Sequence, residues 1–278
     1  MSFGDEIMAS GQALAVARAT GRRVRIVDCD GAPRWESVWE NLPELARPCE
    51  QGDFAELVND RFTRPYMLHP WDRESGMRYS GWRARDHLGA LRFDAAEQIW
   101  AAAAVGGLDW FVVVEPRVPA QSNPNKQWGW KRWQTLVKSM PKANWLQLGP
   151  ADTPALDGAA RIVTPTFRHA AAILAQARAA VLPEGGLHHA AAVLGVPSVV
   201  LFGASPSPMA TGYPFQDNIA APGEPCGAWL PCDHCAGFWR ALYPATVAAR
   251  LRQLLASLPA DPRLRGDQEP ALSVEALS

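Results

Sequence analysis

A double glycine separates a strand-like run from a helix-like run within residues 181–191, Val-Leu-Pro-Glu-Gly-Gly-Leu-His-His-Ala-Ala. Gly185 and Gly186 carry no Cβ, so a ligand could approach the backbone closely at this turn. The free N–H groups and the positive dipole end of the helix that follows suit a phosphate. Glu184 could accept hydrogen bonds from ribose or sugar hydroxyls, or it could cap the helix. The pattern predicts a ligand site at the carboxyl end of a strand; the alternative is an ordinary strand–turn–helix with two core histidines.

A lysine follows another strand-like run at the same predicted sheet edge. Lys126 comes after the apolar run 109–116 and directly before a helix-like segment. It is therefore well placed to meet a diphosphate, and the alternative is a solvated loop lysine. Trp128, Trp130 and Trp133 follow it, and they could pack in the core or stack on a base or sugar. Because Trp130 and Trp133 are three residues apart, we expect at least two of the three in the core.

An acidic pair opens the first predicted helix, which covers residues 6–20 and ends at Gly21. A carboxylate at a helix N-terminus is favoured by the helix dipole, so capping is one interpretation of Asp5. The other is a general base that faces a cleft between two domains.

Three cysteines and one histidine lie within ten residues. The pattern is Cys226-x5-Cys232-x-His234-Cys235. Three thiols and one imidazole match the ligand set of a Cys₃His zinc site, although the spacing is not that of a standard knuckle pair. The alternative is a group of free or partly buried thiols.

Composition excludes several classes of protein. The chain has 278 residues, 48% of them hydrophobic, which allows a sizeable core and roughly two domains of about 150 residues. With 27 basic and 28 acidic residues the net charge is −1, which argues against a generally basic nucleic-acid coat protein and against an acidic disordered chain. Five cysteines make a disulfide framework improbable. Without a signal-peptide pattern or an apolar run of membrane-spanning length, we expect a cytoplasmic protein.

Strand-like and helix-like segments alternate through the second half of the chain, which is typical of a doubly wound α/β domain. The expected strands are 109–116, 144–149, 161–164, 179–182 and 198–203, and the expected helices are 94–106, 128–140, 167–178, 186–194 and 244–257. We expect a first domain over 1–107, a second domain over 108–258 and a flexible tail over 259–278.

The first domain is less regular. It begins with a helix, so either a first strand is missing or its sheet begins with residues 24–28. Residues 34–93 are rich in Trp, Pro and Arg and have weak periodicity. Arginines alternate with aromatic residues in 61–66 and 71–85, a pattern that can contact phosphates and stack on bases. The alternative is a solvated face whose arginines are neutralised by Asp72, Glu74 and Asp86.

Three of these segments together resemble the heptosyltransferase-like glycosyltransferases of family 9, which have the GT-B fold. Residues 3–7, Phe-Gly-Asp-Glu-Ile, look like the first loop of that family. Residues 126–133, Lys-x-Trp-x4-Trp, look like the Lys-x-Trp…Trp segment of its second domain. Residues 184–203, Glu-Gly-Gly-Leu-His-His-Ala-Ala-x2-Leu-Gly-Val-Pro-x4-Phe-Gly, look like its signature Asp-Ser/Thr-Gly-Leu-x-His-x-Ala-Ala…Leu-Gly-x-Pro…Phe-Gly.

The resemblance implies two Rossmann-like domains, the N-terminal one reduced, and a sugar transfer from a nucleotide-diphosphate sugar that needs no metal for catalysis and inverts the anomeric centre. By position, Asp5 would be the base and Lys126 would neutralise the departing diphosphate. The donor's phosphates and sugar would lie among Glu184, Gly185, Gly186, Leu187, His188 and His189, the last matching the family histidine.

The chain departs from the family in Glu184, where the family usually has Asp, and in the shorter N-terminal domain, which selects the acceptor in this fold. The Glu-Gly-Gly-Leu-His-His variant also looks like glycosyltransferase-like proteins of phage and prophage origin, for which a hydroxymethylated DNA base is a plausible acceptor. The alternatives are a lipopolysaccharide-core heptosyltransferase that acts on a glycolipid, a zinc-stabilised nucleic-acid-binding module without catalysis, and another GT-B enzyme such as a sugar epimerase.

Overall fold

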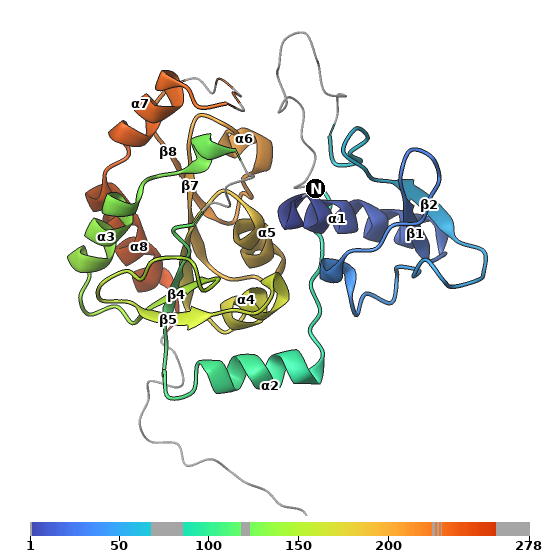
Figure 1. The fold of residues 1–278 in the computed structure, drawn as a ribbon, viewed down its shortest axis with the longest axis horizontal. Coiled ribbons are helices and arrows are strands. Elements are labelled where there is room, and N and C mark those ends of the chain that lie inside the picture. The colour runs from blue at the N-terminus through green and yellow to red at the C-terminus, as the bar shows by residue number, and fades with distance from the viewer. Residues whose placement is uncertain are drawn as a thin grey trace, which may run out of the picture.

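A computed structural model describes residues 2–67, 86–117, 123–223, 226, 228 and 230–259 of the chain. Within them a small N-terminal unit lies beside a larger α/β unit (Figure 1). The predicted tail and the Arg-rich stretch 71–85 fall outside the described residues, apart from Pro259. No helix in the described part of the chain combines the length and the apolar character needed to cross a bilayer.

The N-terminal unit is built on one long helix. Helix α1 (Phe3–Thr20) begins after Ser2, which forms a capping box with Asp5, and ends at Gly21 in the left-handed conformation, with φ of 66°. Both ends have the residues that helix termini favour, so the helix predicted from the sequence is confirmed. Strands β1 (Val24–Val27) and β2 (Ala55–Val58) pair in parallel beside it, and a 3₁₀ turn, η1 (Ser37–Trp39), lies between them in the chain.

The larger unit is a six-stranded parallel sheet in the order β5-β4-β3-β6-β7-β8. The strands are β3 (Val112–Val114), β4 (Trp145–Gly149), β5 (Ala160–Val163), β6 (Ala179–Pro183), β7 (Ser198–Phe202) and β8 (Asp217–Ala220). The helices are α2 (Ala95–Ala104), α3 (Trp130–Ser139), α4 (Phe167–Leu174), α5 (Gly186–Val193), α6 (Pro208–Thr211), α7 (Asp233–Ala241) and α8 (Pro244–Ser257).

This order is that of doubly wound dinucleotide-binding sheets. From β3 the chain builds outward to β5, then returns to place β6 on the other side of β3 and builds outward again to β8. The direction of winding therefore reverses between β3 and β6. In open α/β sheets, ligands bind beside the carboxyl ends of the strands at such a reversal, so the loops after β3 and β6 are the expected site.

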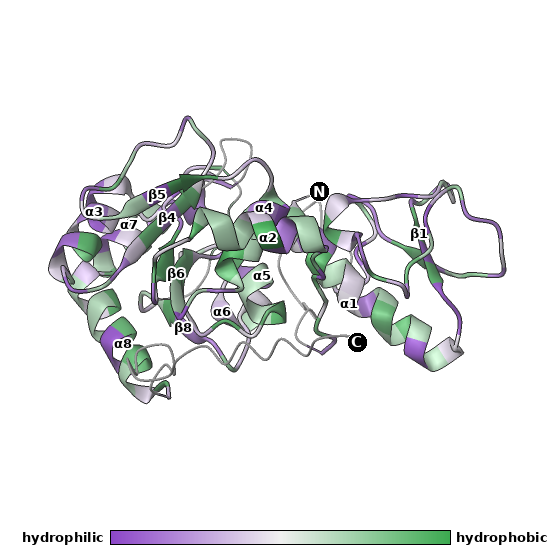
Figure 2. Ribbon diagram, turned by 90° about the horizontal axis from the view of Figure 1, so that it is seen from below, coloured by the Kyte–Doolittle hydropathy of each residue, from purple (hydrophilic) through white to green (hydrophobic). Residues whose placement is uncertain are grey.

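Buried apolar residues lie on both faces of this sheet. Strand β6 is buried throughout and mostly hydrophobic (Figure 2). On one face, a single cluster of buried residues runs from Ile26 and Trp39 of the N-terminal unit to Val113 and Leu182 of the larger sheet. Helix α1 packs on α5, and α2 packs on α4. The two units thus share a continuous core, so the start of α1 is held against the larger sheet.

The opposite face is closed by α3 and α8. Trp128 and Trp133 are buried there, with ring centroids 4.9 Å apart in an edge-to-face arrangement. The Trp128 indole donates to the Leu242 carbonyl at 2.9 Å. The expectation that at least two of these three tryptophans pack in the core is confirmed, and Trp130 is half-buried against the same cluster.

Several elements differ from those expected. Helix α4 ends at Leu174 rather than at residue 178, because the Arg178 N–H is bonded to the Phe111 carbonyl at 3.0 Å as the chain enters β6. Strand β3 covers only the buried core of the predicted 109–116 run. Strand β8, α6 and α7 were not predicted. Strand β8 is a polar edge strand and α7 has a cysteine as its N-cap, so the sequence indicates both elements only weakly.

Candidate functional site

An ion pair bridges the two loops that flank the reversal of the sheet. Lys126 ends a 3₁₀ turn, η2 (Pro124–Lys126), in the connection after β3, and Glu184 directly follows β6. The lysine Nζ pairs with Glu184 Oε2, while the Thr211 hydroxyl donates to Oε1 at 3.2 Å. The structure therefore brings together two residues that lie far apart in the sequence, at the position where this sheet type binds ligands.

Glu184 is only 5% exposed. Burial by itself would raise the pKa of Glu184, but the charges of Lys126 and His189 outweigh this and hold that pKa well below its usual range. Glu184 is therefore a carboxylate that fixes the lysine. Glu184, His188 and His189 place potential metal-ligating atoms within 4.8 Å of one another. A cation there would be repelled by the Lys126 ammonium, so the charge pair accounts for this cluster better than a metal does.

The two glycines of the turn differ in their surroundings. A Cβ added at Gly186 would lie 3.0 Å from Phe167 Cε2 and 3.7 Å from Phe3 Cβ, so packing requires glycine there. Phe3 and Phe167 stack on each other with centroids 4.5 Å apart. A Cβ at Gly185 would meet only the Pro183 carbonyl oxygen at 3.9 Å. Gly185 is the N-cap of α5 and has no side chain with which to cap this helix.

The remaining residues of the motif point into the protein. Leu187, His188 and His189 are all buried. His189 Nδ1 lies 3.0 Å from the Tyr213 hydroxyl, and its Nε2 lies 3.7 Å from Glu184 Oε1. Burial and the neighbouring His189 lower the pKa of His188, which keeps its ring neutral. These three side chains pack beneath the turn in the protein interior. The groups left to contact a ligand are the backbone at Gly185 and the Glu184 carboxylate paired with Lys126.

A glycine lets α1 approach this turn. A Cβ on Gly4 would come within 2.6 Å of His189 Cδ2 and 3.6 Å of the Gly186 Cα. The start of α1 therefore rests on the first turn of α5 (Figure 1). Asp5 belongs to the first turn of α1 and so lies near this contact. The expectation that residues 3–7 and the double glycine belong to one site agrees with this contact.

Asp5 is held by four hydrogen bonds. Its Oδ2 accepts from the Ser2 N–H and hydroxyl, both at 2.9 Å, and its Oδ1 accepts from Arg64 Nη1 at 2.9 Å and from the Tyr66 hydroxyl at 3.0 Å. Burial would raise the pKa of Asp5, but the Arg64 charge and the Ser2 hydrogen bonds outweigh it and lower that pKa. The capping interpretation of Asp5 is thus confirmed. Arg64 and Tyr66, which the sequence offered for contact with phosphates and bases, instead contact this carboxylate.

The thiol cluster assembles at the start of α7. Cys226 Sγ lies 3.8 Å from Cys232 Sγ and 3.4 Å from Cys235 Sγ. Ligating atoms of Cys226, His234 and Cys235 lie within 4.8 Å of one another. All three cysteines are free thiols, since a disulfide would require sulfurs about 2.05 Å apart. Of the four residues that the spacing suggested, Cys226, His234 and Cys235 form this group, and Cys232 adjoins it through Cys226.

Two polar features near the sheet edge were missed in the sequence. Glu115 follows β3 at the reversal of the sheet, and burial raises its pKa to about 8 against the opposing effect of Arg117. Asn123 and Asn125 are 0% and 5% exposed and hold the segment that carries Lys126. The signal for Glu115 was its position directly after a buried strand, the same signal that identified Glu184.

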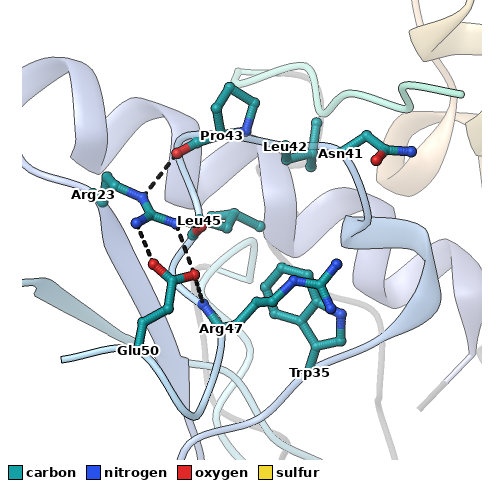
Figure 3. A pocket seen from close by; sticks show the side chains of 8 residues that line it. All are labelled: Arg23, Trp35, Asn41, Leu42, Pro43, Leu45, Arg47 and Glu50. Carbon is teal, nitrogen blue, oxygen red and sulfur yellow. Dashed lines mark hydrogen bonds and ion pairs between the residues drawn. The ribbon is translucent and has the colours of Figure 1, made fainter. Parts of the chain in front are cut away.

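A cavity of about 250 Å³ lies elsewhere, at the start of β1 in the N-terminal unit (Figure 3). Its lining residues are Arg23, Trp35, Asn41, Leu42, Pro43, Leu45, Arg47 and Glu50. Arg23 is bonded to Glu50 and to the carbonyls of Pro43 and Leu45, and Arg47 lies over the Trp35 ring at 4.9 Å. These arginines therefore hold the loop that lines the cavity, and none of the lining residues belongs to the candidate site at the larger sheet.

No protein-family model and no curated protein sequence matches this chain. Solved structures do. The iron-containing dodecameric glycosyltransferase TibC from enterotoxigenic E. coli H10407 superposes with a TM-score of 0.66 at 12% identity, covering 93% of this chain and 75% of that one. A glycosyl transferase of family 9 from Veillonella parvula DSM 2008 has a TM-score of 0.60 at 13% identity, covering 93% and 96%.

E. coli ADP-heptose lps heptosyltransferase II also matches, with a TM-score of 0.48 at 18% identity over 61% of this chain. For this enzyme and two further heptosyltransferase chains the match spans about half of their length, 54%, 46% and 51%. The chain thus has the GT-B-like fold of the heptosyltransferase-like glycosyltransferases of family 9. The predicted fold class is confirmed.

Proposed function

We propose that this protein is a glycosyltransferase that moves a sugar from a nucleoside-diphosphate sugar to an acceptor hydroxyl. The observation that carries the proposal is Lys126 beside the uncapped start of α5, at the reversal of a sheet whose fold is shared with known glycosyltransferases. A lysine and free backbone N–H groups are what a diphosphate leaving group requires.

The leaving group takes up negative charge as the sugar–oxygen bond breaks. Lys126 and the N-terminus of α5 would stabilise that charge, so this chemistry needs no catalytic metal. Glu184 pairs with Lys126 and is itself anchored by Thr211. The carboxylate therefore holds the ammonium at the site before the donor arrives, and the diphosphate then shares the lysine.

Asp5 is the proposed general base. Its lowered pKa keeps it ionised at neutral pH, and Arg64 and Tyr66 fix its orientation. In the proposed step the acceptor oxygen forms a bond to the anomeric carbon, the bond from that carbon to the diphosphate breaks, and the acceptor proton passes to Asp5. Attack from the face opposite the leaving group inverts the anomeric centre.

For the acceptor we propose a hydroxymethylated DNA base first and a lipopolysaccharide core second. In this fold the N-terminal domain selects the acceptor, and in this chain that domain is shorter than in family 9. A phage or prophage origin belongs to the first of these acceptors. Five free cysteines suit a reducing compartment, so the cytoplasm is the proposed location. The two acceptors are separated by incubating the protein with sugar nucleotides and each acceptor and identifying the product by mass spectrometry.

Calorimetry with a panel of nucleoside diphosphates tests the donor half of the proposal. Lys126→Ala should weaken the binding of the preferred nucleotide at least about tenfold, because a charge-assisted contact is lost. Lys131→Ala, an exposed lysine on α3, is the matched control and should bind as the wild type does. If the wild type binds no member of the panel, the proposal is wrong.

We also propose that the thiol cluster binds one structural metal ion. The three thiols and one imidazole fit zinc or iron, both of which accept tetrahedral thiolate sites. With zinc–sulfur bonds of about 2.3 Å, two ligands of a tetrahedral site lie about 3.8 Å apart. The sulfur separations of 3.8 and 3.4 Å are close to that value.

A further inference from the structure

The segment that carries Lys126 is tied to the loop that leads into α7. Asn123 Nδ2 donates to the Ala228 carbonyl at 3.0 Å and to the Ser205 hydroxyl at 3.2 Å. Asn125 Nδ2 donates to the carbonyls of Ala228 at 2.9 Å and Leu230 at 2.7 Å. Both asparagines are buried, so these bonds are poorly replaced by water.

Helix α7 contacts the same segment from the other side. The Trp239 indole donates to the Asn125 carbonyl at 2.7 Å. A Cβ on Gly203, after β7, would lie 2.8 Å from both that carbonyl oxygen and Trp239 Cζ2. The backbone before Lys126 is therefore contacted by Gly203 after β7, by Trp239 of α7, and by Ala228 and Leu230, which lie between Cys226 and Cys232.

The thiols lie at the two ends of that loop. Cys226 precedes Ala228, and its N–H is bonded to the Ala204 carbonyl at 3.0 Å. Cys232 caps α7 and is followed by His234 and Cys235 in its first turn. Ala228 and Leu230, whose carbonyls accept hydrogen bonds from Asn123 and Asn125, lie in the sequence between Cys226 and the other three proposed ligands. A metal held by Cys226 and by those three residues would close the loop at its base.

We propose that a metal ion at Cys226, Cys232, His234 and Cys235 closes this loop and so positions Asn123, Asn125 and the adjoining Lys126 for the donor diphosphate. The inference rests on the proposed function. Asn123 and Asn125 are positioning residues, since they act on the diphosphate through Lys126. The metal takes no part in sugar transfer and acts by fixing backbone.

The first experiment compares metal content with nucleotide affinity. Elemental analysis of the purified full-length chain should find about one zinc or iron per molecule, and visible absorbance separates iron–thiolate from zinc. Removing the metal with a chelator should weaken the affinity for the preferred nucleoside diphosphate about tenfold, and adding Zn²⁺ or Fe²⁺ should restore it. The wild-type chain is used throughout, so the result does not depend on the folding of a variant.

Variants then locate the effect. Cys235→Ser should lose both the metal and the affinity, whereas Cys49→Ser, an exposed cysteine of the N-terminal unit, should keep both. Asn125→Ala should keep the metal and still weaken nucleotide binding, because it cuts the connection between loop and lysine. Melting temperatures confirm that each variant is folded before its affinity is compared.

The outcomes separate the two proposals. A wild type that binds nucleotide, contains metal and loses no affinity on chelation or in Asn125→Ala overturns the positioning role and leaves the glycosyltransferase proposal standing. A wild type that contains no metal and takes up neither Zn²⁺ nor Fe²⁺ overturns the metal site. A wild type that binds no nucleoside diphosphate overturns the proposed function instead.

Discussion

Two helices, α1 and α5, begin next to each other at the candidate site, and their first turns are completed differently. At α1, Ser2 and Asp5 form a capping box, in which the side chain of each accepts from the backbone N–H of the other. At α5, the N-cap is Gly185, which has no side chain to take that role. Because the lysine lies beside these uncapped N–H groups, a phosphate could bind at the start of α5 and accept hydrogen bonds from them.

The acidic residues at the starts of these helices, Asp5 at α1 and Glu184 at α5, also differ in whether their partners are available to a ligand. Asp5 is bonded to Ser2, Arg64 and Tyr66, all from the N-terminal unit, and needs no ligand to be satisfied. Glu184 is paired with Lys126, a residue that a diphosphate would also engage. In the proposed function, the acceptor chemistry belongs to α1 and the donor charge to α5, and this comparison agrees with that division. The four predictions below test that division, from the largest effect to the smallest.

Asp5→Asn should lower kcat by about 10²–10⁴-fold and leave the affinity for nucleoside diphosphates nearly unchanged, because it removes the base and spares the donor side. Steady-state kinetics and calorimetry measure the two quantities. Ser2→Ala is the control, since it removes the cap at a cost of about 1 kcal/mol of stability and keeps the carboxylate. A loss of nucleotide affinity in Asp5→Asn as large as the loss of rate would contradict the division.

Lys126→Ala should lower the free energy of unfolding by about 3 kcal/mol in addition to weakening nucleotide binding, because it leaves the buried Glu184 carboxylate without its partner. Urea unfolding measures the change. The double variant Lys126→Ala/Glu184→Gln should recover part of the loss, since the unpaired charge is then gone. If the double variant is less stable than the single one, the pair is not the source of the effect.

Gly186→Ala and Gly185→Ala should separate packing from binding. The first places a methyl group against Phe167 and should cost about 1–3 kcal/mol of stability. The second makes only an ordinary contact of 3.9 Å with the Pro183 carbonyl oxygen, so stability should hold while the affinity for nucleoside diphosphate falls. Thermal melts and calorimetry on both variants check this. Unchanged affinity in Gly185→Ala would remove Gly185 from the site.

Glu6 and Glu184 should give pH dependences of opposite sign. Burial raises the pKa of Glu6 to about 7 despite its bonds to Arg34, so the folded state binds more protons than the unfolded state between pH 4.5 and 7, and stability falls as pH rises through that range. The pKa of Glu184 is lowered, so its contribution is present above pH 4.5 and is lost as pH falls below it.

Glu6→Gln should therefore flatten the stability profile between pH 4.5 and 7, and Glu184→Gln should flatten it at lower pH, each by on the order of 1 kcal/mol. Urea unfolding at a series of pH values measures both profiles. Glu56→Gln, an exposed glutamate on β2, controls for the loss of one carboxylate. Two variants that change the profile in the same range would show that the assigned shifts are wrong.

Much of the fold could be predicted because its signals are local. The apolar run around Val113, the capping residue Asp94 and the turn at Gly21 each act on their own neighbours, and each forms the predicted element. Strand β8 and helix α7 were missed because neither has such a signal. The edge strand is polar, and α7 is capped by a cysteine, so packing against β7 and the Lys126 segment establishes them.

The candidate site divides in the same way. The sequence by itself determined which residue types were present and which sheet edge they occupy, because Lys126 and Glu184 each follow a buried strand and parallel strands end at one edge. Only the tertiary structure decided their partners. Arg64 and Tyr66 contact Asp5, Gly186 is required by Phe167, and Asn125 joins the thiol loop to Lys126. Such contacts join segments distant in sequence, and no local pattern encodes the packing that brings them together.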